Sequence, residues 1–241
     1  MREAPKKYQQ NIVKLSYKMS GKMTNVLSLS TNVKRNSRCM HRHACPETIC
    51  ASCFAVKTVN SYDALHKNLN YNTDVLTTRE LTLTELDLIA QEIVIACVKN
   101  NTNKFRFESF GDLNNDTQAV NYLRLVIAIK FQSLLWDYPI MCALWTKNPD
   151  YLIKGFNKLS TEGKKIISEN LNVLISSTFV GFPVGNGFIK KIETALNMPV
   201  GVFTVERTEN EKTNCGARSC DKCGRCYEKF TKTTHVFEVL K

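Results

Sequence analysis

Strand-like and helix-like stretches alternate along most of this chain of 241 residues. Five segments have the apolar runs or the two-residue alternation of strands, and four segments between them have the helical repeat of apolar residues. The predicted strands are 25–30, 104–110, 139–146, 172–177 and 200–205, and the predicted helices are 81–98, 117–135, 149–156 and 188–196. Such alternation indicates parallel βα units, which form either a full or partial barrel or an open doubly wound sheet. We expect an incomplete barrel of about five or six strands.

The first of these helices has the clearest pattern. Its apolar face is formed by Leu83, Leu86, Ile89, Ala90, Ile93, Val94 and Cys97. We expect Thr84 to be its N-cap, because a threonine hydroxyl can accept a hydrogen bond from a free amide of the first turn.

Eight of the ten cysteines lie in two tight groups. The first group is Cys39, Cys45, Cys50 and Cys53, and the second is Cys215, Cys220, Cys223 and Cys226. Core packing does not explain thiols at such short intervals, whereas metal sites and iron-sulfur clusters require them, because C-x-x-C brings two thiolates to one centre. We therefore predict a metal or cluster site at each group. The remaining two, Cys97 and Cys142, fall in apolar segments and are predicted to be small core residues.

A disulfide framework is the alternative explanation for the clustered cysteines. Disulfide scaffolds are typical of small secreted domains with little core, but 43% of this chain is hydrophobic. No secretory signal and no membrane-spanning run is visible, so we expect a reduced, intracellular protein. We expect one main domain over residues 1–206 and a cysteine-rich C-terminal extension over residues 207–241.

The formal net charge is +11, which suits contact with nucleic acid or another anion. Metal-thiolate centres are themselves anionic, so cations beside the cysteines can instead balance their charge. Arg38 directly precedes the first group, Arg42 lies within it, and Lys222 and Arg225 lie within the second. Both interpretations stay open at this point.

Polar residues follow the predicted strands where each strand ends. Glu108 lies near the end of one predicted strand, Gly111 and Asp112 follow that strand, Lys147 follows the next, and Ser176 lies at the end of another. In parallel α/β folds ligands bind at the carboxyl ends of strands, so these five residues are the predicted cofactor-binding set. Gly111 would let a ligand approach the backbone, and the carboxylate of Asp112 could accept hydrogen bonds from an ammonium or a ribose hydroxyl. No catalytic residue is assigned.

Other chemistry is less well supported. The chain has no P-loop, no G-x-G-x-x-G and no G-x-S-x-G, which argues against Walker-type nucleotide hydrolysis, Rossmann cofactor binding and serine hydrolase chemistry. His41 and His43 could replace a cysteine as ligand, but four thiols are already present. For the second group, the C-x4-C-x2-C-x2-C spacing suits zinc and iron-sulfur equally.

Several short blocks resemble one known family. Cys50-Ala-Ser-Cys53-Phe-Ala55, Phe107 to Asp112, Leu144 to Pro149 and the late cysteine run are similar, in the same order, to blocks of phage-encoded "gene product 88"-type proteins and related radical-SAM-like families. The resemblance implies a partial TIM-like barrel with a 4Fe-4S cluster at its mouth, and a location in the host cytoplasm. It also implies that Gly111-Asp112 lies where radical SAM enzymes hold the amino group of S-adenosylmethionine.

The first cysteine group departs from the radical SAM pattern. Radical SAM enzymes use C-x-x-x-C-x-x-C and leave one iron open for S-adenosylmethionine, whereas the spacing here is C-x5-C-x4-C-x2-C. An open iron requires that one of Cys39, Cys45 and Cys50 is not a ligand. Two functions follow as hypotheses: a radical-SAM-like enzyme, or a non-catalytic zinc or iron-sulfur protein that binds nucleic acid or a phage or host protein.

Overall fold

The computed structural model describes residues 11–17, 22–215 and 219–239. The N-terminal residues 1–10, in which no secretory signal is predicted, lie outside the described residues. The strands are β1 (Ser16–Tyr17), β2 (Leu27–Leu29), β3 (Lys104–Phe107), β4 (Met141–Thr146), β5 (Leu171–Ser176), β6 (Gly201–Glu206) and β7 (Thr234–Val239). The helices are η1 (Val33–Arg35), α1 (Ser37–Ala44), α2 (Phe54–Ser61), α3 (Asp63–Thr77), α4 (Leu83–Lys99), α5 (Asp116–Leu135), α6 (Pro149–Asn157), α7 (Thr161–Asn170), α8 (Asn186–Leu196) and α9 (Cys220–Cys223).

The described strands form one sheet in the order of the chain, from β1 to β7. β1 pairs antiparallel with β2, and every later pair of neighbours is parallel. The predicted α/β class with a mostly parallel sheet is confirmed, as are all five predicted strands. β7 was not predicted, and it places part of the expected C-terminal extension, 207–241, in the main sheet.

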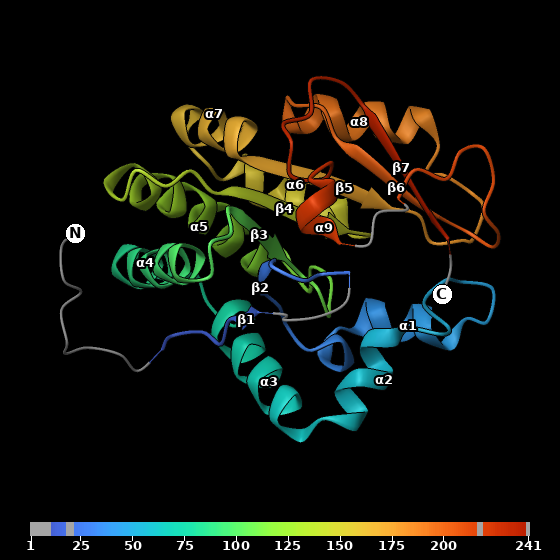
Figure 1. Cartoon of the computed structure of the whole chain (residues 1–241), viewed down its shortest axis with the longest axis horizontal. Coiled ribbons are helices and arrows are strands. Elements are labelled where there is room, and N and C mark those ends of the chain that lie inside the picture. The colour runs from blue at the N-terminus through green and yellow to red at the C-terminus, as the bar shows by residue number, and fades with distance from the viewer. Residues whose placement is uncertain (1–10, 18–21, 216–218, 240–241) are drawn as a thin grey trace.

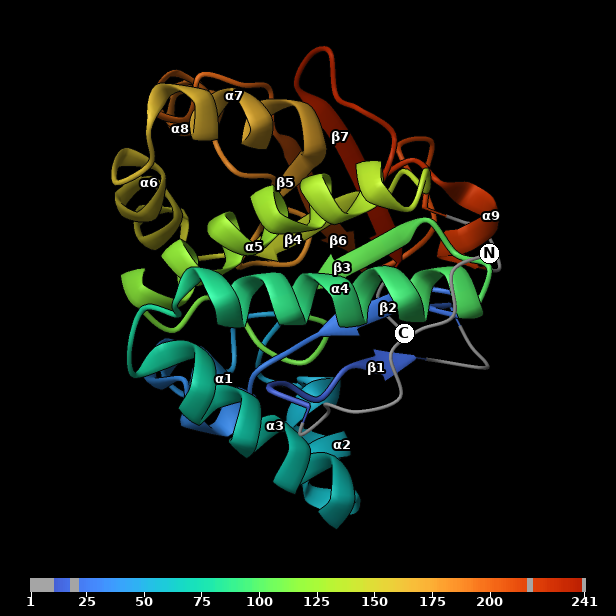
Figure 2. The same ribbon diagram turned by 90° about the vertical axis from the view of Figure 1, so that its left-hand side faces the viewer.

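The two faces of the sheet are used differently because side chains alternate along each strand. Phe105, Phe107 and Leu144 belong to the main core together with apolar residues of α4 and α5. Figures 1 and 2 show these helices lying across one side of the sheet, while α1 and α2 lie away from them. Arg106 and Trp145, the alternate residues of β3 and β4, face the opposite side, where a smaller core and a cavity lie.

The start of α4 differs from the prediction by one half turn. Thr82, and not Thr84, is the N-cap, and its hydroxyl accepts a hydrogen bond from the Glu85 amide at 3.3 Å. The Glu85 carboxylate accepts in return from the Thr82 amide at 2.9 Å. This reciprocal capping box satisfies two amide groups at once, which a cap at Thr84 would not do.

Helix α3 was not predicted from the sequence. Some of its buried positions are polar, so its sequence lacks the regular apolar repeat of a packed helix. Asn72 and Thr73 are buried on it beside Leu69 and Leu76. The Asn72 side chain donates to the carbonyls of Lys14 and Ser30, both at 2.9 Å, and accepts from the Lys14 amide. These bonds tie α3 to the segments around β1 and β2, so the burial carries no unpaired polar group.

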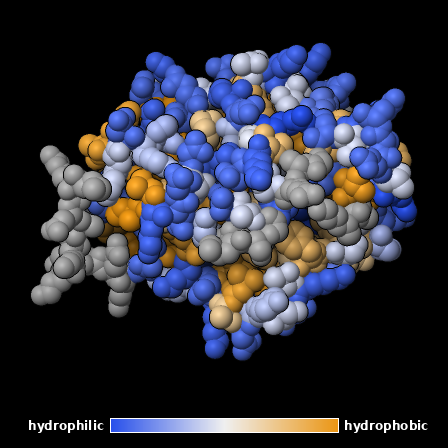
Figure 3. Space-filling model, in the orientation of Figure 1, coloured by the Kyte–Doolittle hydropathy of each residue, from blue (hydrophilic) through white to orange (hydrophobic). Residues whose placement is uncertain are grey.

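Cys97 and Cys142 are buried in the main core, which confirms their predicted role. None of the ten cysteines forms a disulfide. Within the described ranges no helix combines the length and apolarity that a membrane span requires. Hydrophilic side chains cover most of the face in Figure 3, and hydrophobic patches interrupt them.

Candidate functional site

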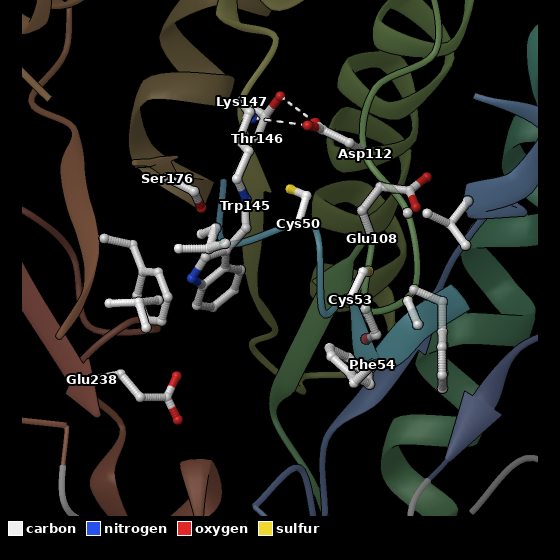
Figure 4. A pocket seen from close by; sticks show the side chains of 18 of the residues that line it. Cys50, Cys53, Phe54, Glu108, Asp112, Trp145, Thr146, Lys147, Ser176 and Glu238 are labelled. Carbon is white, nitrogen blue, oxygen red and sulfur yellow. Dashed lines mark hydrogen bonds between the residues drawn. The ribbon is translucent and has the colours of Figure 1, made fainter. Parts of the chain in front are cut away.

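A cavity of about 610 Å³ lies on the side of the sheet away from α4 and α5. Its wall includes Cys39, Cys50 and Cys53 of the first group and Cys215, Cys220 and Cys226 of the second. All five predicted cofactor-binding residues also line it: Glu108, Gly111, Asp112, Lys147 and Ser176. Figure 4 shows Cys50 between Asp112 and Trp145, with Lys147, which directly follows β4, and Ser176, at the end of β5, nearby. The strand-end residues and both cysteine groups are therefore neighbours in one cavity.

Helix α1 holds Cys39 against the end of β3 through Asn36, its N-cap. The Asn36 side chain accepts from the Cys39 amide at 3.1 Å and donates to the carbonyls of Asp112 and Leu113 at 3.0 and 3.2 Å. Because Asn36 is buried, these bonds fix the start of the helix to the loop after the strand.

A few hydrogen bonds hold the loop between Cys45 and Cys53 in place beside the cavity. The Thr48 hydroxyl donates to the carbonyls of Arg42 and Cys45 at 2.7 and 3.0 Å, and the Ile49 amide donates to Thr178 at 2.9 Å. His43 Nδ1 donates to the Cys50 carbonyl at 2.8 Å. As a result Cys50 and Cys53 reach the cavity wall, and Cys45 is not among the residues that line it.

The thiols near the strand ends lie in a mixed electrostatic environment. Burial raises the pKa of Cys39 and of Cys50, while the positive charges of Arg42 and Lys147 lower both pKa values. Among the described residues, no three side chains of His, Cys, Asp or Glu lie close enough together to hold a single metal ion. Cys39, Cys50 and Cys53 thus line one wall of the cavity, but their sulfur atoms are not arranged around a single metal position.

Asp112 ties three parts of the site together. Its carboxylate accepts from the Thr146 hydroxyl at 2.6 Å, from the amides of Leu113 and Lys147 at 2.8 and 3.0 Å, and from Arg42 Nη1 at 3.4 Å. Figure 4 shows two of these bonds. The carboxylate joins the ends of β3 and β4 to α1, and its lone pairs are largely occupied by protein donors.

Glu108 is fully buried beside this site, with a backbone φ of 56°. Its carboxyl group accepts from the Thr31 amide and hydroxyl at 3.2 and 2.9 Å, and from Gln118 and Tyr122 at 2.5 Å each. Burial raises the pKa of Glu108 to about 7, although hydrogen bonds from Tyr122 and Thr31 oppose the rise. No ion pair with a described cation compensates this carboxyl group.

We expect Glu108→Gln to change how stability depends on pH. Because the folded-state pKa is raised from 4.5 to about 7, the stability due to the neutral carboxyl is fully present below 4.5 and is lost as the pH rises through 7. The free energy of unfolding of the variant, relative to the native chain, should therefore increase by up to about 3 kcal/mol between pH 4.5 and pH 8. Urea titrations at both pH values measure it. Glu162→Gln, at an exposed position, should show no such change, and an equal difference at both pH values for Glu108→Gln would refute the assignment.

At Gly111 the neighbouring atoms leave no space for a side chain. A Cβ there would lie 2.4 Å from Glu108 Oε2 and 3.1 Å from the Thr31 carbonyl oxygen. We expect Gly111→Ala to destabilise the fold by about 1–3 kcal/mol through overpacking. Gly187→Ala is the matched control, because nothing lies within 4 Å of its Cβ position on α8. Thermal melts compare the two, and equal melting temperatures would contradict the close approach.

Two cavity residues, Arg106 and Trp145, were not selected from the sequence as part of the site. The Arg106 Cζ lies 3.9 Å from the centroid of the Trp145 ring, and both side chains line the cavity. Ser109 lines the same cavity and is buried, and among the described residues its hydroxyl has no hydrogen-bond partner. Arg106 could have been found, since its place in the alternation of β3 puts it opposite Phe105 and Phe107.

The chain was compared with protein-family models, with curated proteins and with solved structures, and none of the three comparisons gives a match.

Proposed function

We propose that this protein holds an iron-sulfur cluster through Cys39, Cys50 and Cys53, with the adjoining cavity receiving an organic cofactor or substrate. One observation carries the proposal: these three thiols line the cavity at the strand ends, whereas Cys45 does not. A set of three ligands gives a four-iron cluster one iron without a protein ligand. Cys45 is then the cysteine of the group that is not needed, and it serves the backbone at the end of α1 instead.

We further propose that the sheet is the wall of an incomplete barrel of the TIM type. Two features support this: the strands follow one another in chain order, and the helices of the main core lie against one face only. A doubly wound sheet would instead reverse its strand order and place helices on both faces. The cavity would then be the barrel interior, and the first cysteine group would lie at its carboxyl-terminal mouth, where barrel enzymes place their chemistry.

The residues present suit such a cluster. Iron-sulfur clusters are held by cysteine thiolates, each bound to a different iron, so the thiols need not converge on one point. Thiolates in a buried wall need nearby positive charge, and Arg42 and Lys147 supply it to both Cys39 and Cys50. These two cations would also offset part of the negative charge of the bound cluster.

Around the cluster, the chain offers a cavity of suitable size and polarity. Its volume of about 610 Å³ falls in the usual range of cofactor and ligand pockets. Gly111 lines the wall without a side chain, and Ser176 places a hydroxyl there at the end of β5. The Ser109 hydroxyl, which has no hydrogen-bond partner among the described residues, can bond a ligand. When bound, a cluster with an open iron supplies the reducing chemistry that cleaves S-adenosylmethionine, which is the activity that the family resemblance suggests.

Binding of S-adenosylmethionine to the reduced, anaerobically prepared protein tests this proposal. We expect addition of the compound to change the electron paramagnetic resonance spectrum of the cluster, because the open iron gains a ligand. The Cys45→Ser variant should respond in the same way. An unchanged spectrum at saturating concentration would refute the open iron, and a colourless, zinc-only protein would instead favour a non-catalytic binding module.

A further inference from the structure

The second cysteine group lies at the end of the cavity opposite to the first. Lys104, the first residue of β3, donates from Nζ to the Asp221 carbonyl and carboxylate of α9 at 2.7 and 3.0 Å. Asn172, near the start of β5, donates to the Cys226 carbonyl at 3.1 Å. Helix α9 and Cys226 are therefore attached near the amino-terminal ends of β3 and β5.

Further bonds fix the individual cysteines in this place. The Cys220 amide donates to the Lys22 carbonyl at 2.7 Å, and the Cys215 amide donates to Phe237 of β7 at 3.0 Å. The Lys22 ammonium in turn donates to the Cys215 carbonyl at 3.2 Å. The described backbone around the thiols is thus held by bonds to β7 and to the segment before β2.

Two buried donors in this region have no acceptor. Arg106 Nε and the Tyr227 hydroxyl are both buried without a hydrogen-bond partner among the described residues. The Arg106 side chain stacks on Trp145, and its Nη1 lies 3.4 Å from the Met23 sulfur, but no described carboxylate forms an ion pair with it. A buried donor without an acceptor destabilises the fold, and the effect is larger where the donor is charged.

Sulfur atoms of the second group lie beside the same small core as these two donors and could accept hydrogen bonds from them. Cys215, Cys220 and Cys226 pack against the small core that contains Trp145 and Tyr227. The charge of Arg106 acts on Cys220, Cys226 and Tyr227 alike. A neutral thiol is a weak acceptor, whereas a metal-bound thiolate carries the negative charge that a guanidinium and a phenol would bind.

We propose that the second group, Cys215, Cys220, Cys223 and Cys226, binds a structural metal-thiolate centre, with Arg106 and Tyr227 donating hydrogen bonds to its sulfurs. No three of these thiols lie close enough together in the described structure to hold a single ion, whereas the thiolates of an iron-sulfur cluster each bind a different iron, so the arrangement suits a cluster better than zinc. Such a cluster is anionic, and Arg106 balances its charge. Four protein ligands close such a centre to substrate. Its place at the amino ends of the strands suits a stabilising role, since ligands of parallel sheets bind at the other end. This centre is separate from the cluster proposed for the first group.

Metal titration of the full chain, with chelator competition, tests this inference. Cys220→Ser and Cys226→Ser should each lose the metal of the second group and keep the iron of the first. Tyr227→Phe, which removes only the hydroxyl, and Arg106→Gln should keep the fold but bind this metal about 10–100-fold more weakly, as loss of an outer partner does. Arg106→Lys should restore part of the affinity, because it keeps the charge.

The controls separate this site from the rest of the molecule. Cys142→Ala changes a buried core thiol and should leave the metal content unchanged, and Arg79→Gln removes an exposed cation with the same expected result. Elemental analysis then tells zinc from iron-sulfur. Full metal content in Cys220→Ser and Cys226→Ser would refute the metal site, and native affinity in both Tyr227→Phe and Arg106→Gln would refute the two donors.

Discussion

Cys39→Ser, Cys50→Ser and Cys53→Ser are each expected to lose most of the iron and acid-labile sulfide bound by the first cysteine group, whereas Cys45→Ser retains both. The reason is positional: three of these thiols line the cavity at the strand ends, and Cys45 does not. Metal binding and local folding are coupled, so the three ligand variants should also melt at a lower temperature and be less soluble. Iron and sulfide assays on protein prepared without oxygen measure the effect.

Cys97→Ala is the matched control for the cysteine variants. Cys97 is buried on α4 in the main core, so its loss removes packing and no ligand. Its melting temperature should fall modestly while its iron content stays native. If Cys45→Ser lost its iron together with the other three, the cluster would have four ligands and no open iron, and iron retained by Cys53→Ser would remove that residue from the ligand set.

Asp112→Ala is expected to destabilise the protein by about 3–5 kcal/mol, because it breaks a buried ion pair and removes the acceptor of several buried donors. The side chain of Asp112 is 7% exposed and that of its partner Arg42 is 15% exposed. Without the carboxylate, the Thr146 hydroxyl and the Lys147 amide also lose their acceptor. Urea denaturation of the native chain and of the variant, in the same metal-bound state, gives the difference in the free energy of unfolding.

Asp150→Ala provides the comparison with an exposed pair. Asp150 binds Arg38 through two hydrogen bonds, but the side chains are 47% and 41% exposed. Exposed ion pairs contribute about 0–1 kcal/mol, so this variant should remain close to the native chain. If the two variants were equally destabilised, Asp112 would not be the residue that joins α1 to the ends of β3 and β4.

The sheet could be predicted from the sequence because its strands follow simple patterns. The alternation in 104–110 and the apolar runs in 139–146 and 172–177 gave strands close to their observed bounds, and the rule for strand ends brought Glu108, Asp112 and Lys147 to one cavity. Helix α3 was not predicted, because two of its buried residues, Asn72 and Thr73, are polar. Their side chains form hydrogen bonds with residues that lie far away in the sequence. A single-sequence pattern contains no sign of such partners.

Which cysteines face the cavity could not be predicted from their spacing. That choice depends on the path of the loop between Cys45 and Cys53, which is set by bonds from Thr48 and from Ile49 to residues on both sides of it. The separation of the two cysteine groups to opposite ends of the strands has a similar origin. It depends on bonds from Lys104 and Asn172, whose partners follow them by more than 50 residues.

The central claim is that the first cysteine group holds an iron-sulfur cluster beside the cavity. Iron, zinc and sulfide content, together with a visible absorption spectrum, should be measured on the native chain purified without oxygen. The account predicts at least about four irons and four sulfides per chain, with broad absorption near ~400 nm from thiolate-bound clusters. A colourless protein that contains zinc and no sulfide would contradict it.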